Sequence, residues 1–163
     1  VRRLVLACTG TGVLSVPGRP GVLRHMATPR RHREPEHASK VAAEIYGGSM
    51  RTHPEQARVL LNPGELRTAR GYYYQLLAAS GWSSLGWLPL IRQRTLVIAG
   101  DDDPLIPVIN PKTMARLIPR SELHLYTGGH LGLLTDPKTH APVVERFLQG
   151  QSRLGTLEGQ WAH

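Results

Sequence analysis

The sequence predicts an α/β fold with a parallel, doubly wound sheet, and three observations support this class. Two apolar runs, at residues 3–10 and 94–100, end in small residues, as parallel strands covered on both faces do. Segments with helical signals alternate with these runs along the chain. Charged or glycine-rich loops follow the strands at the ends where such sheets gather reactive groups. The predicted order is strand, helical insertion, strand, helix, strand, helix.

The first half of the chain contains one predicted strand and a long helical segment. The strand is RLVLACTG, at residues 3–10, and Gly and Pro residues between 12 and 20 predict a loop after it. Helices are predicted for PEHASKVAAEIYG, for HPEQARVLLN and for GYYYQLLAASGW, with Pro35 or Pro54 in the first turn of the first two. Because these helices are too many for one crossover, residues 13–90 are expected to form a lid or cap inserted after a core segment at 1–12.

The second half repeats the strand and helix alternation at shorter spacing. RTLVIAG is the second strand, and NPKTMARLI is a helix for which Asn110 is the expected cap and Pro111 the first residue. SELHLYTG, at residues 121–128, alternates apolar and polar residues and is expected to be a third strand near a sheet edge. APVVERFLQ is expected to be an amphipathic helix. Residues 91–150 therefore form the expected C-terminal core, and residues 151–163 a loose tail.

Two polar residues stand where a hydrolytic acid and base would be delivered. Asp103 follows the second strand within GDDDPLIP, and His130 follows the third within GGH. In a triad the Asp accepts a hydrogen bond from the protonated nitrogen of the imidazole, while the other nitrogen takes the proton of the nucleophile. Asp101 and Asp102 could compete for this role or shape the loop, and an Asx turn before Pro104 is the structural alternative for Asp103 itself.

The formal net charge of +8 invites a nucleic-acid interpretation, but the charge is unevenly placed. Residues 1–70 carry twelve Lys and Arg against five acidic residues, whereas residues 71–163 carry eight against seven. No helix-turn-helix, zinc knuckle or interleaved aromatic pattern accompanies the basic excess, so no nucleic-acid partner is expected. Its densest point, PRRHRE, is interpreted as a solvated loop or helix end, with an anionic partner as the alternative.

The cysteine, hydropathy and histidine patterns argue against a disulfide-rich, a membrane-spanning or a metal-binding protein. A single cysteine, Cys8, excludes an internal disulfide framework and fits a reducing compartment, so a cytoplasmic protein is expected. No apolar run reaches eighteen residues, so no membrane span is expected, and VRRLVLAC is interpreted as a buried strand rather than a signal segment. The other histidines lack metal-ligand spacing, and neither a metal nor another cofactor is expected.

Several stretches together resemble a known family. TLVIAGDDDPLIP followed by GGHLGLLTDP resembles the C-terminal half of an α/β-hydrolase. LVLACTGTGVLSVPGRPGVL, MATPRR, IYGGSMR and GYYYQLLAASGWSSLGWLPLI extend the resemblance to the intracellular poly(3-hydroxyalkanoate) depolymerases of the medium-chain type, over residues 3–149. The resemblance implies serine-type ester hydrolysis of an intracellular polyester, with association to polymer granules as a further expectation. It places the family acid on Asp103 and the family base on His130.

The resemblance also gives the helical insertion a function, and it shows where this sequence departs from the family pattern. The insertion corresponds to the lid, whose aromatic residues are candidates for substrate binding or for ordinary lid packing: Tyr72, Tyr73, Tyr74, Trp82 and Trp87. The family nucleophile lies in a Gly-x-Ser-x-Gly turn before the first strand, and neither that turn nor the first half of the sheet is in this sequence. Ser49, Ser83 and Ser84 lack the required glycines, and Cys8 is expected to pack in the core.

Three explanations of this departure stay open: a piece of a longer hydrolase, a truncated inactive remnant, or a chain whose missing half comes from a partner. Two further functions also stay open. One is an esterase of the same fold acting on small esters, which short-chain substrates would distinguish from a polymer hydrolase. The other is a non-catalytic binding protein that uses its basic first half to hold an anionic partner.

Overall fold

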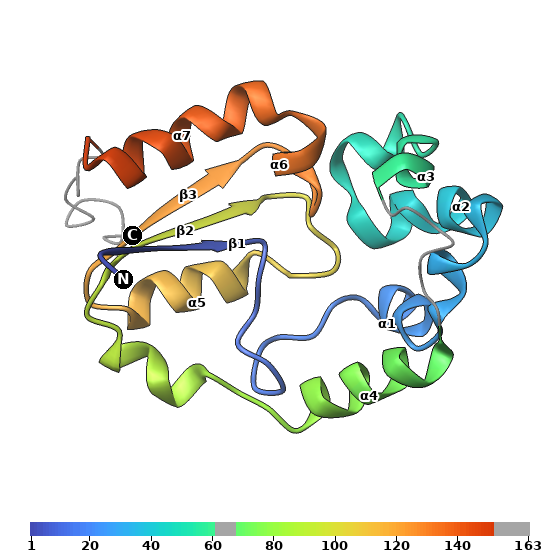
Figure 1. Ribbon diagram of the computed structural model, residues 1–163, viewed down its shortest axis with the longest axis horizontal. Helices are drawn as coiled ribbons and strands as arrows, with labels where there is room; N and C mark the ends of the chain where they lie inside the picture. The colour runs from blue at the N-terminus through green and yellow to red at the C-terminus, as the bar shows by residue number, and fades with distance from the viewer. Residues whose placement is uncertain (61–67, 152–163) are drawn as a thin grey trace.

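The computed structural model describes residues 1–60 and 68–151 as a small parallel sheet with a helical region beside it (Figure 1). The sheet has the order β1-β2-β3, formed by β1 (Arg3–Ala7), β2 (Arg94–Gly100) and β3 (Ser121–Tyr126). Both strand pairs are parallel, with Leu4 opposite Thr95 and Val97 opposite Leu123. The predicted α/β class and the parallel pairing are therefore confirmed.

Both faces of the sheet are covered because β2 is apolar on both sides. Val97 packs with Met114 and Ile118 on the face covered by α5 (Ile109–Leu117) and by the 3-10 segment η3 (Leu85–Leu90). Leu96 and Ile98 point to the other face, where Phe147 of α7 (Pro137–Gln149) covers them. Successive side chains of a strand alternate between faces, so one continuous apolar run supplies two cores. α5 and α7 lie on opposite sides of the sheet (Figure 1).

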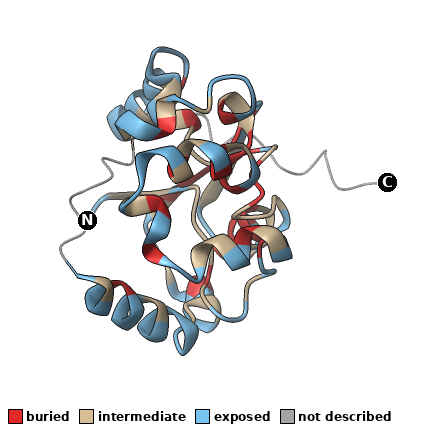
Figure 2. Ribbon diagram, turned by 90° about the vertical axis from the view of Figure 1, so that its right-hand side faces the viewer, coloured by how far each residue is buried: buried red, intermediate tan, exposed pale blue. Residues whose placement is uncertain are grey.

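The helical region lies between β1 and β2 in the sequence and has a core of its own. It comprises α1 (Pro20–Met26), η1 (Pro29–His32), α2 (Pro35–Tyr46), η2 (Gly48–Arg51), α3 (Gln56–Leu60) and α4 (Ala69–Ser80). Val22 of α1, Ile45 of α2 and Met50 of η2 are buried together at its centre. The buried residues concentrate along α2, while α4 is exposed along most of its length (Figure 2).

Several element boundaries differ from those predicted. β1 ends at Ala7, three residues before the predicted end, because Cys8 has a positive φ of 44° and breaks the extended backbone. α7 begins at Pro137, four residues before APVVERFLQ, because the Asp136 side chain accepts a hydrogen bond from the amide of Thr139 and caps the helix. The predicted helix HPEQARVLLN is described as α3 up to Leu60, and its last two residues, like the predicted tail, lie outside the described residues.

The predicted capping role of Asn110 is wrong. Asn110 lies inside α5, whose first residue is Ile109, and its buried side chain makes no capping hydrogen bond. Its Oδ1 accepts from the Val16 amide at 2.8 Å, and its Nδ2 donates to the Val16 carbonyl at 2.8 Å. Asn110 therefore fixes the loop after β1 to α5, a long-range contact that its local sequence could not indicate.

The basic stretch PRRHRE is also less solvated than predicted. It forms η1, in which Arg31 is buried, whereas Arg30 and Glu34 form an exposed ion pair at 2.8 Å. The Arg31 Nη1 donates to the Tyr72 hydroxyl at 2.8 Å, and the Tyr72 hydroxyl donates to the Met26 carbonyl. One member of this basic cluster is thus a packing residue that holds α4 to the rest of the helical region.

Candidate active site

Asp103 and His130 meet at the carboxyl end of the sheet, where the sequence predicts an acid and a base. Asp103 follows β2 and His130 follows β3, two strands that pair in parallel, so their loops leave the same sheet edge. The His130 Nδ1 lies 2.8 Å from the Asp103 Oδ2. The Asp103 side chain is fully buried, while that of His130 is 21% exposed. The buried carboxylate therefore contacts an imidazole that is partly open to solvent.

The loop geometry fixes which nitrogen of His130 faces the acid. The Asp103 Oδ1 accepts the amides of Leu105 and Ile106, each at 2.9 Å, which leaves the Oδ2 for the imidazole. A carboxylate that accepts at both oxygens requires a donor at the His130 Nδ1. The proton is therefore placed on Nδ1, and the Nε2 is left as the basic nitrogen. The Asx turn proposed as an alternative for Asp103 is present, and the same side chain also contacts His130.

The other two aspartates of the loop have distinct structural tasks. The Asp101 Oδ1 accepts the amide of Gly128 at 3.0 Å, which ties the acid loop to the loop that carries His130. The Asp102 carboxylate makes a two-pronged contact with Arg51, from Nε to Oδ2 and from Nη2 to Oδ1, each at 2.8 Å. Its Oδ2 also accepts the amide of Gly48 at 2.8 Å. The three carboxylates thus hold three different partners.

A glycine junction joins the helical region to both loops. The His130 amide donates to the Tyr46 carbonyl at 2.7 Å, and the Tyr46 ring stacks on the imidazole with centroids 6.2 Å apart. A Cβ on Gly47 would overlap the Asp102 carbonyl, a Cβ on Gly48 would overlap the Gly129 amide, and a Cβ on Gly129 would overlap the Tyr46 carbonyl. Only residues without a Cβ permit this approach of three backbones.

A second hydrogen-bond network, formed by Cys8, Tyr126 and Gly129, supports the His130 loop. The Tyr126 hydroxyl donates to the Gly129 carbonyl at 2.9 Å and lies 3.2 Å from the Cys8 Sγ. Because the phenol has one proton, which it gives to Gly129, the Cys8 thiol donates to the Tyr126 oxygen. Burial raises the pKa of Cys8, and burial together with the neighbouring thiol raises the pKa of Tyr126. Burial therefore favours the protonated thiol of Cys8, which is partly buried and packs against the core formed by Leu96, Ile98 and Phe147.

One group among the described residues could hold a metal ion: Cys8, Asp103 and His130 offer ligand atoms within 4.8 Å of one another. Such a site would need the thiolate form of Cys8, and burial opposes it. It would also have to displace the hydrogen bond between Asp103 and His130. The present contacts therefore favour an acid and base pair at this position over a metal centre.

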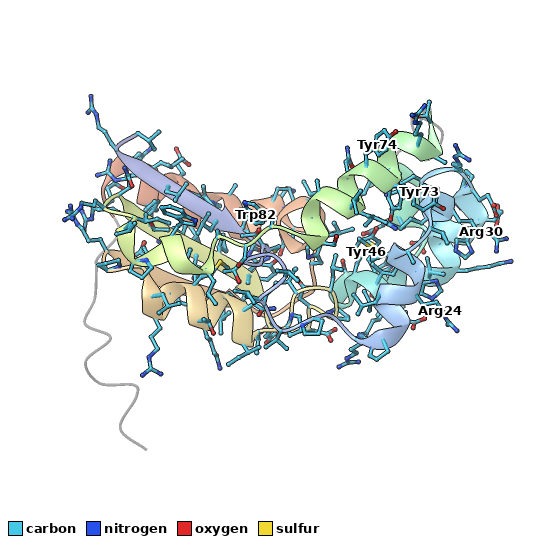
Figure 3. All side chains as sticks on the ribbon, turned by 90° about the horizontal axis from the view of Figure 1, so that it is seen from below. Arg24, Arg30, Tyr46, Tyr73, Tyr74 and Trp82 are labelled. Atoms are coloured by element: carbon cyan, nitrogen blue, oxygen red, sulfur yellow. The ribbon has the colours of Figure 1, made fainter. Side chains whose placement is uncertain are left out.

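The aromatic candidates are not brought together into one lining. Tyr72 is buried and bonded within the helical region, as described above. Tyr73, Tyr74, Trp82 and Trp87 are each about half exposed or more, and the first three lie along α4 and just after it (Figure 3). The Ser83 hydroxyl donates to the Thr11 carbonyl at 2.8 Å, so this side chain links two loops.

Sequence reasoning missed the partners that hold the two candidate residues. Tyr46, Gly48, Arg51 and Tyr126 contact Asp102 or the His130 loop, and no local motif predicts this role for them. The signal available was the glycine pair followed by an arginine in IYGGSMR, which contributed only to the resemblance. An arginine beside a run of three aspartates in the fold cannot be recognised from positions 51 residues apart.

We expect a pH dependence of stability from the contact of Asp102 with Arg51. The guanidinium of Arg51 lowers the pKa of Asp102 from its ordinary value to about 2. The stabilisation is therefore complete above about pH 4 and is lost as the pH falls toward 2. The two side chains are 45% and 40% exposed, so the effect should be no more than about 1 kcal/mol. Urea unfolding at several pH values measures it.

The matched variants for this measurement are Asp102→Asn and Arg51→Gln. Each should be less stable than the unchanged chain at pH 6, and the difference should shrink between pH 4 and pH 2. The double variant should lose little more stability than either single variant, since both substitutions remove the same contact. A stability difference that stays constant down to pH 2 would contradict the ion pair.

A family profile described as the alpha/beta hydrolase fold matches residues 1–137. The chain therefore belongs to the α/β-hydrolase family. Within the family, it is 47% identical over 156 residues to the poly(3-hydroxyalkanoate) depolymerase of Ectopseudomonas oleovorans. This match covers 96% of the chain and 55% of the depolymerase, so the chain spans about half the length of this curated relative.

Solved structures agree on the fold. A meta-cleavage product hydrolase from Pseudomonas fluorescens IP01 superposes with a TM-score of 0.71 at 17% identity, covering 93% of this chain and 57% of the other. An enol-lactonase from Burkholderia xenovorans LB400 gives a TM-score of 0.71 at 19% identity, covering 91% and 56%. At these identities the similarity establishes the architecture, and the chain corresponds to part of each hydrolase.

Proposed function

We propose that this chain supplies the acid and the base of a serine-type hydrolase that cleaves intracellular poly(3-hydroxyalkanoate). The observation that carries the proposal is the 2.8 Å contact between the Asp103 carboxylate and the His130 Nδ1 at the carboxyl end of the sheet. The 47% identity to a poly(3-hydroxyalkanoate) depolymerase supports the choice of polyester as substrate. Residence in the cytoplasm at the granule surface belongs to the same proposal. Over the described ranges, no helix is both long and apolar enough to cross a bilayer.

The proposed chemistry assigns one task to each residue. The His130 Nε2 takes the proton of a serine hydroxyl as the oxygen attacks the ester carbonyl, and it later returns a proton to the leaving alcohol. Asp103 fixes the Nδ1 proton and stabilises the imidazolium that forms in between. The serine and the oxyanion donors belong to the half of the fold that this sequence does not contain. In this proposal that half comes from a longer chain or from a partner.

A chimaera tests the polyester activity directly. In it, this chain replaces the matched part of the Ectopseudomonas oleovorans depolymerase, whose remaining part supplies the other half of the fold. We expect the chimaera to hydrolyse medium-chain polyester granules. A folded chimaera that cleaves only soluble short-chain esters would replace the proposal with a small-ester esterase. A folded chimaera that cleaves neither would favour the non-catalytic binding protein.

The exposed aromatic residues are the proposed contacts with the polymer surface. Replacing Tyr74 and Trp87 by Ala in the chimaera should lower granule hydrolysis about tenfold, because apolar contact area with the polymer is lost. Turnover of a soluble ester should stay within about twofold, since neither residue contacts Asp103 or His130. Val59 and Leu148 are exposed apolar residues elsewhere, and their double Ala variant is the matched control. Equal losses on granules and on the soluble ester would contradict a surface-binding role.

A further inference from the structure

A cavity at the amino ends of the strands is lined mainly by arginines. Its volume is about 390 Å³, and its lining residues are Val1, Arg2, Arg3, Arg92, Gln93, Arg94 and Arg120. The strands bring these residues together, because Arg3 lies opposite Arg94 in the parallel register and Arg120 immediately precedes β3. Segments from three distant parts of the chain therefore contribute to one basic cavity.

This cavity is separate from the candidate active site. Asp103 and His130 follow the carboxyl ends of β2 and β3, whereas the arginines lie at the opposite ends, near the N-terminus (Figure 1). β2 has seven residues, so about 20 Å of strand separates the two places. A ligand in the arginine cavity would not occupy the space in front of the imidazole.

The electrostatics of the cavity favour an anion of high charge. Guanidinium groups keep their charge at all physiological pH values, and none of the seven lining residues is acidic. Glu122, two residues after Arg120, is the acidic residue nearest in sequence and does not line the cavity. Charges of one sign within a single concave site focus their field on a bound counter-ion. A single monovalent anion would offset only a fraction of that charge.

The donor geometry also leaves capacity for a ligand. Arg3 uses its Nη1 to bond the Leu148 carbonyl at 3.1 Å, and Arg120 uses its Nη1 to bond the Arg92 carbonyl at 3.4 Å. These bonds orient two of the side chains and engage one nitrogen of each, while a guanidinium carries five N–H donors. Arginine binds phosphate through paired N–H groups, and the volume lies within the range of small-molecule sites.

We propose that this arginine cavity binds an oligophosphate, a linear anion with several phosphate groups, independently of the hydrolytic site. The test is isothermal titration calorimetry of the full chain with inorganic triphosphate as the probe. We expect saturable binding at 0.1 M salt, at least tenfold weakened at 0.5 M salt, because screening weakens exposed charge interactions. Orthophosphate should bind at least tenfold more weakly than triphosphate.

The variant pair separates the cavity from the general basicity of the chain. Arg92→Gln with Arg120→Gln should weaken triphosphate binding at least tenfold, and both residues are exposed, so the fold should be retained. Arg24→Gln with Arg33→Gln removes the same charge from exposed positions of the helical region, where Arg24 lies far from the strands (Figure 3), and should change affinity less than twofold. Equal weakening by both pairs, or no binding to the unchanged chain, would overturn the proposal. Circular dichroism of each variant checks the fold.

Discussion

Replacing Asp103 by Asn in the chimaera should lower kcat by about four orders of magnitude, the loss seen when a triad carboxylate becomes an amide. The amide nitrogen of Asn can donate to the imidazole, which favours the tautomer with its proton on Nε2. That nitrogen could then no longer accept the serine proton. The carbonyl side of Asn still accepts the amides of Leu105 and Ile106, so the loop itself should persist. Steady-state turnover of a polyester oligomer measures the change.

The neighbouring aspartates provide matched controls for this prediction. Asp101→Asn and Asp102→Asn make the same chemical change within the same loop, but their carboxylates contact Gly128 and Arg51 rather than His130. Each should retain kcat within about tenfold of the unchanged chimaera. His130→Gln should match Asp103→Asn or exceed it, and the double variant should be no worse than the poorer single variant, since the two residues act as a unit. An equal loss of kcat in Asp102→Asn and Asp103→Asn would show that activity depends on the structure of the loop rather than on the Asp103 carboxylate.

Replacing Gly129 by Ala should destabilise the chain by more than about 3 kcal/mol, among the largest effects of a single substitution. The added Cβ would overlap the Tyr46 carbonyl, which accepts the amide of His130. Because the overlapping atoms are backbone, no side-chain rotation can relieve the contact. Either the helical region or the His130 loop must move away. Urea unfolding of the full chain measures the loss, and a variant recovered only as insoluble protein agrees with it.

The control for the glycine prediction lies at the end of α4. A Cβ on Gly81 would have no heavy atom within 4 Å, and Gly81 has a φ of −105°, so Gly81→Ala should change stability by less than about 0.5 kcal/mol. Gly48→Ala should behave like Gly129→Ala, since its Cβ would overlap the Gly129 amide and its φ is +50°. Near-normal stability of both junction variants would contradict the close approach of the helical region to the His130 loop.

The helical region contacts both loops that carry the candidate residues. The Tyr46 ring stacks on the His130 ring, and the Tyr46 carbonyl accepts a hydrogen bond from the His130 amide. Arg51 donates to the carboxylate of Asp102, the neighbour of Asp103. The position of the His130 loop is therefore tied to the position of α2 and η2. The helical region and the loops that carry Asp102 and His130 pack together at this junction.

Much of the architecture was readable from the sequence because its signals are local. The run TLVIA is apolar on both faces, which predicts a central parallel strand, and β2 is that strand. Pro35 and Gly47 bracket α2 as predicted, because proline suits a first helical turn and glycine suits a helix end. Asp103 and His130 are predicted because the acidic loop follows the second strand and the GGH loop follows the third, and the family resemblance selects Asp103 among the three aspartates. In a parallel sheet, loops that follow neighbouring strands lie at the same edge.

The tertiary structure alone decided which groups meet. Nothing local distinguishes Asp102 from Asp103, yet one contacts Arg51 and the other His130, because the turn after β2 points their side chains in different directions. The Cys8 thiol, the Asn110 amide and the five arginines of the basic cavity likewise find partners or neighbours far along the chain. The sequence by itself determined the strands, most of the helices and the two loops in which Asp103 and His130 lie. Distances between side chains depend on how distant elements pack, so only the folded chain could decide them.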